Sequence, residues 1–188
     1  MNTHPTLLNT LNSVLVVIDM QAKLSAVMAE KDAELMHENT VSLLEAAKNL
    51  AIPVLVTEQY PNGLGSTEKT VLDALPGTAQ VFEKTAFSCT GASGFMPALN
   101  IIARKQIILV GQEAHVCVLQ TALDLMALGY QVHIVEDAIC ARKAEHKFYA
   151  MQRLQAQNAV ITNYESVLFE WLRDATHPDF KAISSLLR

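Results

Sequence analysis

The chain has 188 residues, a length typical of one folded domain, and we expect a single domain over 1–188 with a core at about 12–170 and a helical tail at 171–188. Hydrophobic residues make up 51% of the sequence and charged residues 18%, a balance that predicts a packed globule and excludes extensive disorder. A net charge of −5 without any Lys/Arg-rich run argues against a nucleic-acid partner.

Short apolar, β-branched runs alternate along the chain with segments of helical periodicity. The expected strands cover residues 13–18, 53–57, 80–82, 106–110, 131–135 and 159–162. The expected helices cover residues 31–51, 67–75, 94–104, 116–128, 143–155 and 164–173, with a further short one near the C-terminus. Residues 58–77 are rich in Pro, Gly and Asn and are expected to form a long loop around one short helix. This alternation predicts an α/β fold whose parallel sheet is covered by helices on both faces.

Cysteine content and the N-terminus bear on the cellular setting. The three cysteines, Cys89, Cys117 and Cys140, are too sparse and irregular for a disulfide framework or a Cys-x-x-Cys metal site. The N-terminal residues lack the basic start and apolar core of a secretory signal. No apolar run approaches the ~20 residues that span a membrane. We therefore expect a cytoplasmic protein without a membrane partner.

Asp19 and Cys117 stand where a parallel sheet usually binds ligands, beyond the carboxyl ends of its strands, and Lys84 is a third candidate that depends on its neighbours. Asp19 follows the first strand, where a partly desolvated carboxylate suits a general base, although a helix cap or a turn is the alternative. Lys84 taken alone would be a surface lysine, but near a carboxylate and a thiol it would stabilise their negative charges. Cys117 lies where a strand ends and a helix begins, where the helix macrodipole should favour the nucleophilic thiolate.

Together these positions resemble the isochorismatase-like hydrolase superfamily, also called the cysteine hydrolases. The resemblance covers about residues 12–170 and rests on Asp19-Met20-Gln21, on Lys84, on the run Gly-Gln-Glu-Ala-His-Val-Cys-Val at 111–118, on Thr121-Ala122 and Gly129, and on Val135-Glu136-Asp137-Ala138. It implies a Rossmann-like, three-layer α/β/α sandwich with a six-stranded parallel sheet, and a catalytic set of Asp19, Lys84 and Cys117. It also implies a non-proline cis peptide between Gln112 and Glu113, near which backbone N–H groups, including that of Cys117, would face an oxyanion.

The resemblance extends to the activity. In amidase members the cysteine attacks a carbonyl carbon, which implies here the hydrolysis of a C–N bond in a small molecule through a thioester on Cys117, with Asp19 as base and Lys84 as charge stabiliser. A catalytically silent protein that binds a small ligand or a partner on the same scaffold remains an alternative. So does an isochorismatase-type ether hydrolase, although members with that activity replace the cysteine. The chain looks closest to the small, single-domain subgroup with no settled substrate.

The remaining expectations concern the pocket, the cofactor and the assembly. The segment at 57–62 lacks the Asp-x-His pattern with which family nicotinamidases bind a metal, so we expect no metal and no other cofactor. Homo-oligomers, dimers or larger, are expected by family analogy. His115 is expected to form a pocket wall or a hydrogen bond, because residues two apart in a turn rarely face one another. The full set of candidate pocket residues, for which packing or capping roles remain open, is Gln21, Glu58, Gln59, Tyr60, Phe87 and His115.

Overall fold

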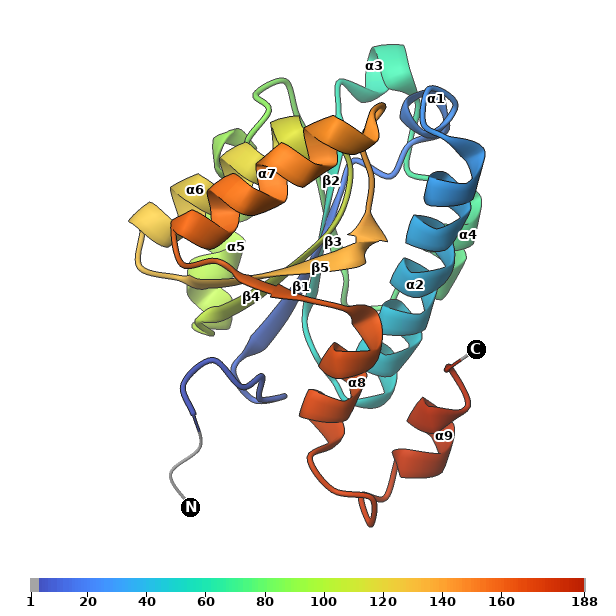
Figure 1. The fold of residues 1–188 in the computed structure, drawn as a ribbon, viewed down its shortest axis with the longest axis vertical. Coiled ribbons are helices and arrows are strands. Elements are labelled where there is room, and N and C mark those ends of the chain that lie inside the picture. Colours follow the sequence, from blue (N-terminus) through green and yellow to red (C-terminus); the bar gives the residue numbers. More distant parts are fainter. Residues whose placement is uncertain (1–3, 188) are drawn as a thin grey trace.

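A computed structural model describes residues 4–187 and contains a six-stranded sheet whose strand pairs are all parallel (Figure 1). The strands are β1 (Ser13–Ile18), β2 (Val54–Gln59), β3 (Gln80–Lys84), β4 (Gln106–Gly111), β5 (Gln131–Ile139) and β6 (Val160–Thr162). Their order across the sheet is β3-β2-β1-β4-β5-β6. The expected fold class is therefore confirmed.

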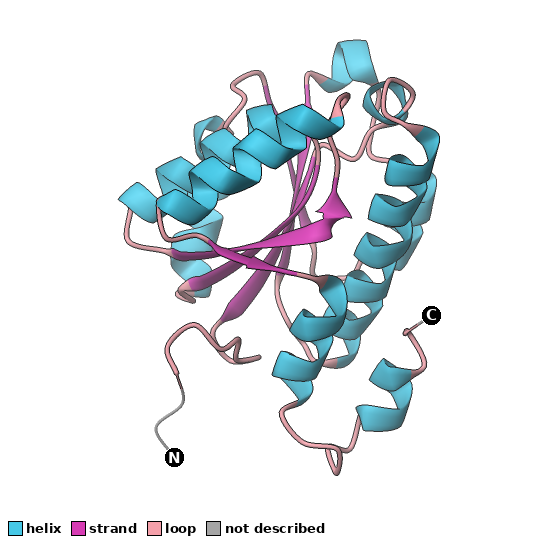
Figure 2. Ribbon diagram, viewed as in Figure 1, coloured by secondary structure: helices cyan, strands magenta, loops and turns pink. Residues whose placement is uncertain are grey.

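Helices cover both faces of this sheet (Figure 2). They are α1 (Ala22–Ser25), α2 (Glu30–Asn49), α3 (Pro61–Leu64), α4 (Lys69–Ala74), α5 (Phe95–Ile102), α6 (Leu119–Ala127), α7 (Ala144–Ala156), α8 (Tyr164–Leu172) and α9 (Phe180–Ser184). A 3₁₀ turn at Cys89–Gly91 and a π-helical turn at Ala114–Val118 complete the described elements. None of the helices in residues 4–187 is long and apolar enough to cross a membrane.

Alternate residues of the buried strands point into two separate apolar layers. Val14, Val16 and Ile18 of β1 pack on the side of α5, α6 and α7. Leu15 and Val17 pack on the other side, with α2, α4 and α8, and Ile183 of the C-terminal helix α9 is buried in the same layer. Figure 1 shows these two groups of helices on opposite sides of the sheet. The continuous apolar runs in the sequence follow from this double coverage.

The sheet order reverses between β1 and β4, which makes this point the topological switch of the fold. Ile18, at the end of β1, is paired with Thr57 of β2 on one side and with Gly111 of β4 on the other. Gly111 has φ +107°, and a Cβ atom there would collide with the carbonyl oxygen of Ile18. Only glycine fits this close approach, so the chain leaves β4 beside the end of β1.

Several element boundaries differ from the sequence-based expectation, mostly at the carboxyl ends of strands. β2 and β3 each continue two residues further, to Gln59 and Lys84, which are partners in the register of the two strands. Polar residues at strand ends pair through their backbones, and a hydrophobic pattern does not reveal this. The loop at 58–77 contains α3 as well as α4, and the helix expected from residue 116 begins instead as the π-helical turn.

Candidate active site

An ion pair between Asp19 and Lys84 lies at the centre of the site. Lys84 Nζ is 2.6 Å from Asp19 Oδ2, and both side chains are 0% exposed. Asp19 leaves β1 in the left-handed region, with φ +51°, while its N–H donates to the carbonyl oxygen of Thr57 (3.0 Å). Lys84 is the last residue of β3, two strands away. The carboxyl ends of β1 and β3 thus bring together residues 65 positions apart in the chain.

The ammonium group of Lys84 is fixed by further acceptors. Besides Asp19, Nζ donates to Gln59 Oε1 (2.7 Å) and to the carbonyl oxygen of Phe87 (3.0 Å). Its distance to Cys117 Sγ is 3.7 Å. The lysine therefore bridges the carboxylate and the sulfur, which is the position expected of a functional Lys84.

Cys117 occupies the π-helical turn between β4 and α6, and its residue exposure is 5%. Local π-helical turns are rare and often coincide with functional sites. The thiol borders a cavity of about 490 Å³. The structure thus brings Asp19, Lys84 and Cys117 together beside a hollow that a small molecule can enter.

The protonation of Cys117 corrects one expectation from the sequence. Burial and the nearby Asp19 carboxylate raise the pKa of the Cys117 thiol to about 12, although the Lys84 ammonium acts in the opposite direction. Cys117 therefore rests as the thiol, not as the thiolate that its place before a helix was expected to favour. A nucleophilic role for Cys117 requires a base that removes its proton.

Asp19 is the group placed to be that base. Burial raises the pKa of its carboxyl group, while the charge and hydrogen bond of Lys84 and the hydrogen bonds from Cys117 and Thr57 lower it. The hydroxyl of Thr57 donates to Asp19 Oδ1 (2.8 Å) from within β2. A carboxylate whose pKa is raised towards neutrality is a stronger base than an exposed one.

Replacing Thr57 by Val should shift the pH dependence of the site without removing any charged group. The variant loses a hydrogen bond that stabilises ionised Asp19, so the pKa of Asp19 should rise further. An activity that needs ionised Asp19 rises as the pH passes the pKa of Asp19. The acid limb of the pH–activity profile should therefore move to higher pH in the variant, while the rate on the plateau changes little. The pH profiles of the two proteins test this, and an unmoved acid limb would contradict the role of Thr57.

The cavity beside Cys117 contains only some of the expected pocket residues. Its lining residues are Leu24, Gln59, Tyr60, Leu64, Thr85, Phe87, Glu113, Val116 and Cys117. The structure thus places Gln59, Tyr60 and Phe87 at the cavity. It does not place Gln21, Glu58 or His115 there, which corrects these three expectations.

The displaced candidates have other partners. The side chain of Gln21 bonds to the backbone of Gln59 and of Gly65, which orders the segment that carries the cavity wall. Glu58 Oε1 accepts hydrogen bonds from the backbone N–H and the hydroxyl of Thr67 (2.7 and 2.8 Å). Both are structural contacts of the loop after β2.

His115 turns away from the cavity and stacks on His146 of α7, with ring centroids 4.5 Å apart. Burial lowers the pKa of His115. Nearby, Glu113 Oε2 accepts from Arg142 Nε (2.8 Å) within the same chain.

The peptide bond between Gln112 and Glu113 is cis, at the position that the resemblance implied. The Gln112 side chain lies away from the cavity, and its Nε2 donates to the carbonyl oxygen of Asp19 and to Ser25 Oγ (3.1 Å each). Gln112 therefore supports the backbone on which Asp19 is carried.

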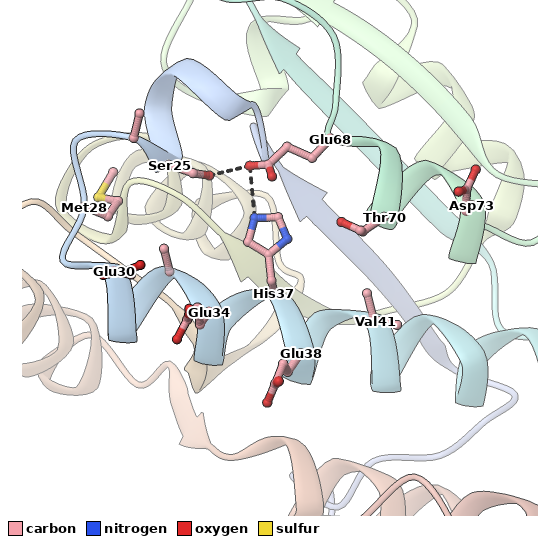
Figure 3. A pocket seen from close by; sticks show the side chains of 12 residues that line it. Ser25, Met28, Glu30, Glu34, His37, Glu38, Val41, Glu68, Thr70 and Asp73 are labelled. Atoms are coloured by element: carbon pink, nitrogen blue, oxygen red, sulfur yellow. Dashed lines mark hydrogen bonds and ion pairs between the residues drawn. The ribbon is translucent and has the colours of Figure 1, made fainter.

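A larger cavity, of about 850 Å³, lies between α1, α2 and α4 and shares no lining residue with the Cys117 cavity (Figure 3). Glu68 Oε1 contacts both Ser25 Oγ (2.5 Å) and His37 Nε2 (3.0 Å) there. In a Ser-His-acid triad the imidazole lies between hydroxyl and carboxylate, whereas here the carboxylate lies between the other two. Ser25 is thus not activated, and the smaller cavity with its thiol is the better candidate for chemistry.

Other groups were not foreseen from the sequence or do not contribute. Thr57 and the cavity walls Leu24, Leu64, Thr85 and Val116 were not expected; of these, Thr57 alone carried a signal, as a polar residue at the end of an expected strand. Cys89 and Cys140 are buried free thiols. Within residues 4–187, no cluster of three or more His, Cys, Asp or Glu side chains could hold a metal ion.

Comparison with known proteins identifies the family. Residues 13–166 match the model described as Isochorismatase domain. The chain is 42% identical over 146 residues to isochorismatase domain-containing protein 1 of Danio rerio, which covers 78% of this chain and 51% of that protein. The chain therefore spans about half the length of this relative.

Two further matches extend over nearly the whole chain. The secreted isochorismatase effector Isc1 of Phytophthora sojae is 37% identical over 185 residues, covering 94% of this chain and 85% of the relative. Because this relative is named as secreted, family membership does not fix the compartment. The solved structure of the MAR1 ribonuclease from Caenorhabditis elegans superposes with a TM-score of 0.90 at 36% identity, covering 96% of this chain and 91% of that one. On these matches, and on the fold and site described above, the chain belongs to the isochorismatase domain family.

Proposed function

We propose that this protein is a cysteine hydrolase that cleaves a C–N, amide-type bond of a small molecule through a thioester on Cys117. The observation that carries the proposal is the contact of a buried Asp19–Lys84 pair with the Cys117 thiol, which lines the cavity of about 490 Å³, whereas Cys89 and Cys140 do not line it. Because the pKa of Cys117 is about 12, the thiol needs a base, and Asp19 is beside it. These are the parts that nucleophilic catalysis by cysteine requires.

In the proposed reaction Asp19 takes the proton from Cys117 Sγ while the sulfur bonds to the carbonyl carbon of the substrate. Asp19 then gives this proton to the nitrogen, the C–N bond breaks and the amine leaves. Water attacks the thioester carbon as Asp19 removes its proton, the C–S bond breaks, and the proton passes to the departing sulfur as the acid is released. Asp19 thus acts as base and as acid in each half of the cycle.

Lys84 and the backbone near Cys117 would stabilise the charges that develop. The Lys84 ammonium lies near enough to offset the negative charge on Asp19 and on the sulfur. The N–H of Ala114 donates to the carbonyl oxygen of Cys140 (2.8 Å), so it is not free for an oxyanion. We assign that role to the N–H of Cys117; one such donor is typically worth about 3 kcal/mol in the transition state.

The relatives' names suggest other activities, which fit this site less well. The net charge of −5 and the apolar cavity wall offer little to an RNA backbone. Ether hydrolysis does not need a thioester, so this activity would not explain why Cys117 lies beside a base. Homo-oligomer formation and a cytoplasmic location remain predictions.

Incubation with a panel of amides, ureides and hydroxamates tests the proposal. A substrate should release its amine and leave an acyl adduct on Cys117, visible by intact mass as the substrate less the amine. Replacing Cys117 by Ala should remove the adduct and lower turnover by at least about 10⁴-fold, because the nucleophile is lost. The matched control is Cys140→Ala, which removes another buried thiol outside the cavity. An inactive wild type without adducts would favour a silent binding protein.

A further inference from the structure

We propose that the substrate of this site is an uncharged amide with an apolar acyl group, and that the cavity excludes carboxylated molecules. This inference rests on the proposed function, since it takes Cys117 as the nucleophile. It concerns the substrate class, which the proposed function leaves open.

The walls of the Cys117 cavity are mainly apolar. They carry the side chains of Leu24 from α1, Leu64 from α3, Val116 from the π-helical turn, and Tyr60 and Phe87 from connecting segments. The volume of about 490 Å³ lies within the usual range for small-molecule sites. Such walls favour an apolar acyl group, and each buried methylene should strengthen binding by about four-fold.

The polar groups at the base of the cavity are already engaged. A lysine ammonium has three N–H donors, and those of Lys84 are used by Asp19, Gln59 and Phe87. The amide of Gln59 is also engaged at both ends, because its Oε1 accepts from Lys84 and its Nε2 donates to the carbonyl oxygen of Thr85 (2.9 Å). Lys84 therefore retains no N–H for a substrate carboxylate, and the one N–H left on Gln59 Nε2 carries no positive charge.

The one charged residue that lines the cavity is negative. Glu113 accepts from Arg142, and Arg142 itself is not a lining residue and is half exposed. A carboxylate that entered would give up its hydration without gaining a positive partner in the lining, and burial of an unpaired charge is strongly unfavourable. A neutral amide avoids this cost. The same argument disfavours carboxylated substrates such as isochorismate itself.

Two thiol-alkylating reagents of similar size, one neutral and one negatively charged, provide the test. Iodoacetamide is neutral and iodoacetate is anionic, and both alkylate thiols. Their rates at Cys117 are followed by peptide mass spectrometry on the folded protein, and the intrinsic ratio is taken from Cys117 of the same chain unfolded in urea. We expect the folded protein to prefer iodoacetamide by at least about 10-fold more than the unfolded chain does. Equal ratios in the two states would overturn the proposal.

A cation placed in the wall should remove the selectivity for the neutral reagent. Leu64→Lys adds an unpaired ammonium to the cavity, whereas the matched variant Leu72→Lys adds one on α4, outside it. Only the first should remove the preference for iodoacetamide; if both or neither do, the cavity charge is not the cause. Should Leu64→Lys fail to fold, the wild-type comparison still decides. If Cys117 prefers iodoacetamide but no amide is turned over, the hydrolase function is overturned and the inference that the cavity takes uncharged ligands stands. If amides are turned over but Cys117 shows no preference between the reagents, only the inference on the ligand class is overturned.

Discussion

Replacing Asp19 by Asn should make the sulfur of Cys117 more reactive while it abolishes turnover. After burial, the Asp19 carboxylate is the largest cause of the raised pKa of Cys117, and the Lys84 ammonium opposes it. Asparagine removes the negative charge at position 19 and leaves the Lys84 ammonium in place, so the pKa of Cys117 should fall from about 12. More thiolate is then present at neutral pH. Turnover should nevertheless fall by about 10²–10⁴-fold, because no group remains to carry the proton to the leaving amine.

The rate of Cys117 alkylation by iodoacetamide as a function of pH, measured beside amide turnover, separates these two effects. The midpoint of the alkylation curve should move to lower pH in Asp19→Asn. A matched control is Glu83→Gln, which removes one carboxylate from an exposed position next to Lys84 in β3. If Asp19→Asn keeps turnover within ten-fold of the wild type, Asp19 is not the base; slower alkylation would show that its carboxylate activates the thiol at rest.

The positions of Asp19 and Cys117 could be found from the sequence because each follows a long, fully buried strand. β1 and β4 are apolar runs at the centre of the sheet, and parallel strands place their carboxyl ends along one edge. Lys84 could not be found in this way. It ends a short edge strand whose other residues are partly or fully exposed, so no apolar pattern marks it, and it required the family resemblance.

The pKa of Cys117 and the residues of the cavity wall could not be predicted from the sequence for a different reason. The raised pKa of Cys117 depends on how deeply the sulfur is buried and on its approach to Asp19, both of which are tertiary properties. Leu24 and Leu64 reach the cavity from α1 and α3, which have four residues each. Helices this short show no periodicity that a sequence pattern can detect. The false expectation for Glu58 arose because a strand-end carboxylate is equally suited to hold a loop.

Replacing Lys84 by Met should destabilise the fold by about 3–5 kcal/mol near neutral pH, because it leaves Asp19 as a buried carboxylate without its partner. The loss should depend on pH in a defined direction. Without the ammonium that lowers it, the pKa of Asp19 rises further above its value in the unfolded chain. When the pKa of a carboxyl group is higher in the folded protein than in the unfolded chain, ionisation favours the unfolded chain. The folded protein therefore loses stability as the pH rises from the pKa in the unfolded chain to the pKa in the folded protein. The destabilisation should therefore be smaller near pH 4 than near pH 8 in urea unfolding curves.

The double variant Asp19→Asn/Lys84→Met identifies the cause of this loss. Removing both charges leaves no unpaired ion, so the double variant should be more stable than Lys84→Met alone, and its stability should lose the added pH dependence. Lys69→Met is the matched control, since Lys69 pairs with Asp73 on the surface at the same 2.6 Å separation. That exposed pair should contribute no more than about 0.5 kcal/mol. Equal losses for Lys69→Met and Lys84→Met would mean that burial of the Asp19–Lys84 pair has no energetic consequence, and the account of a base held ready by its buried partner would fail.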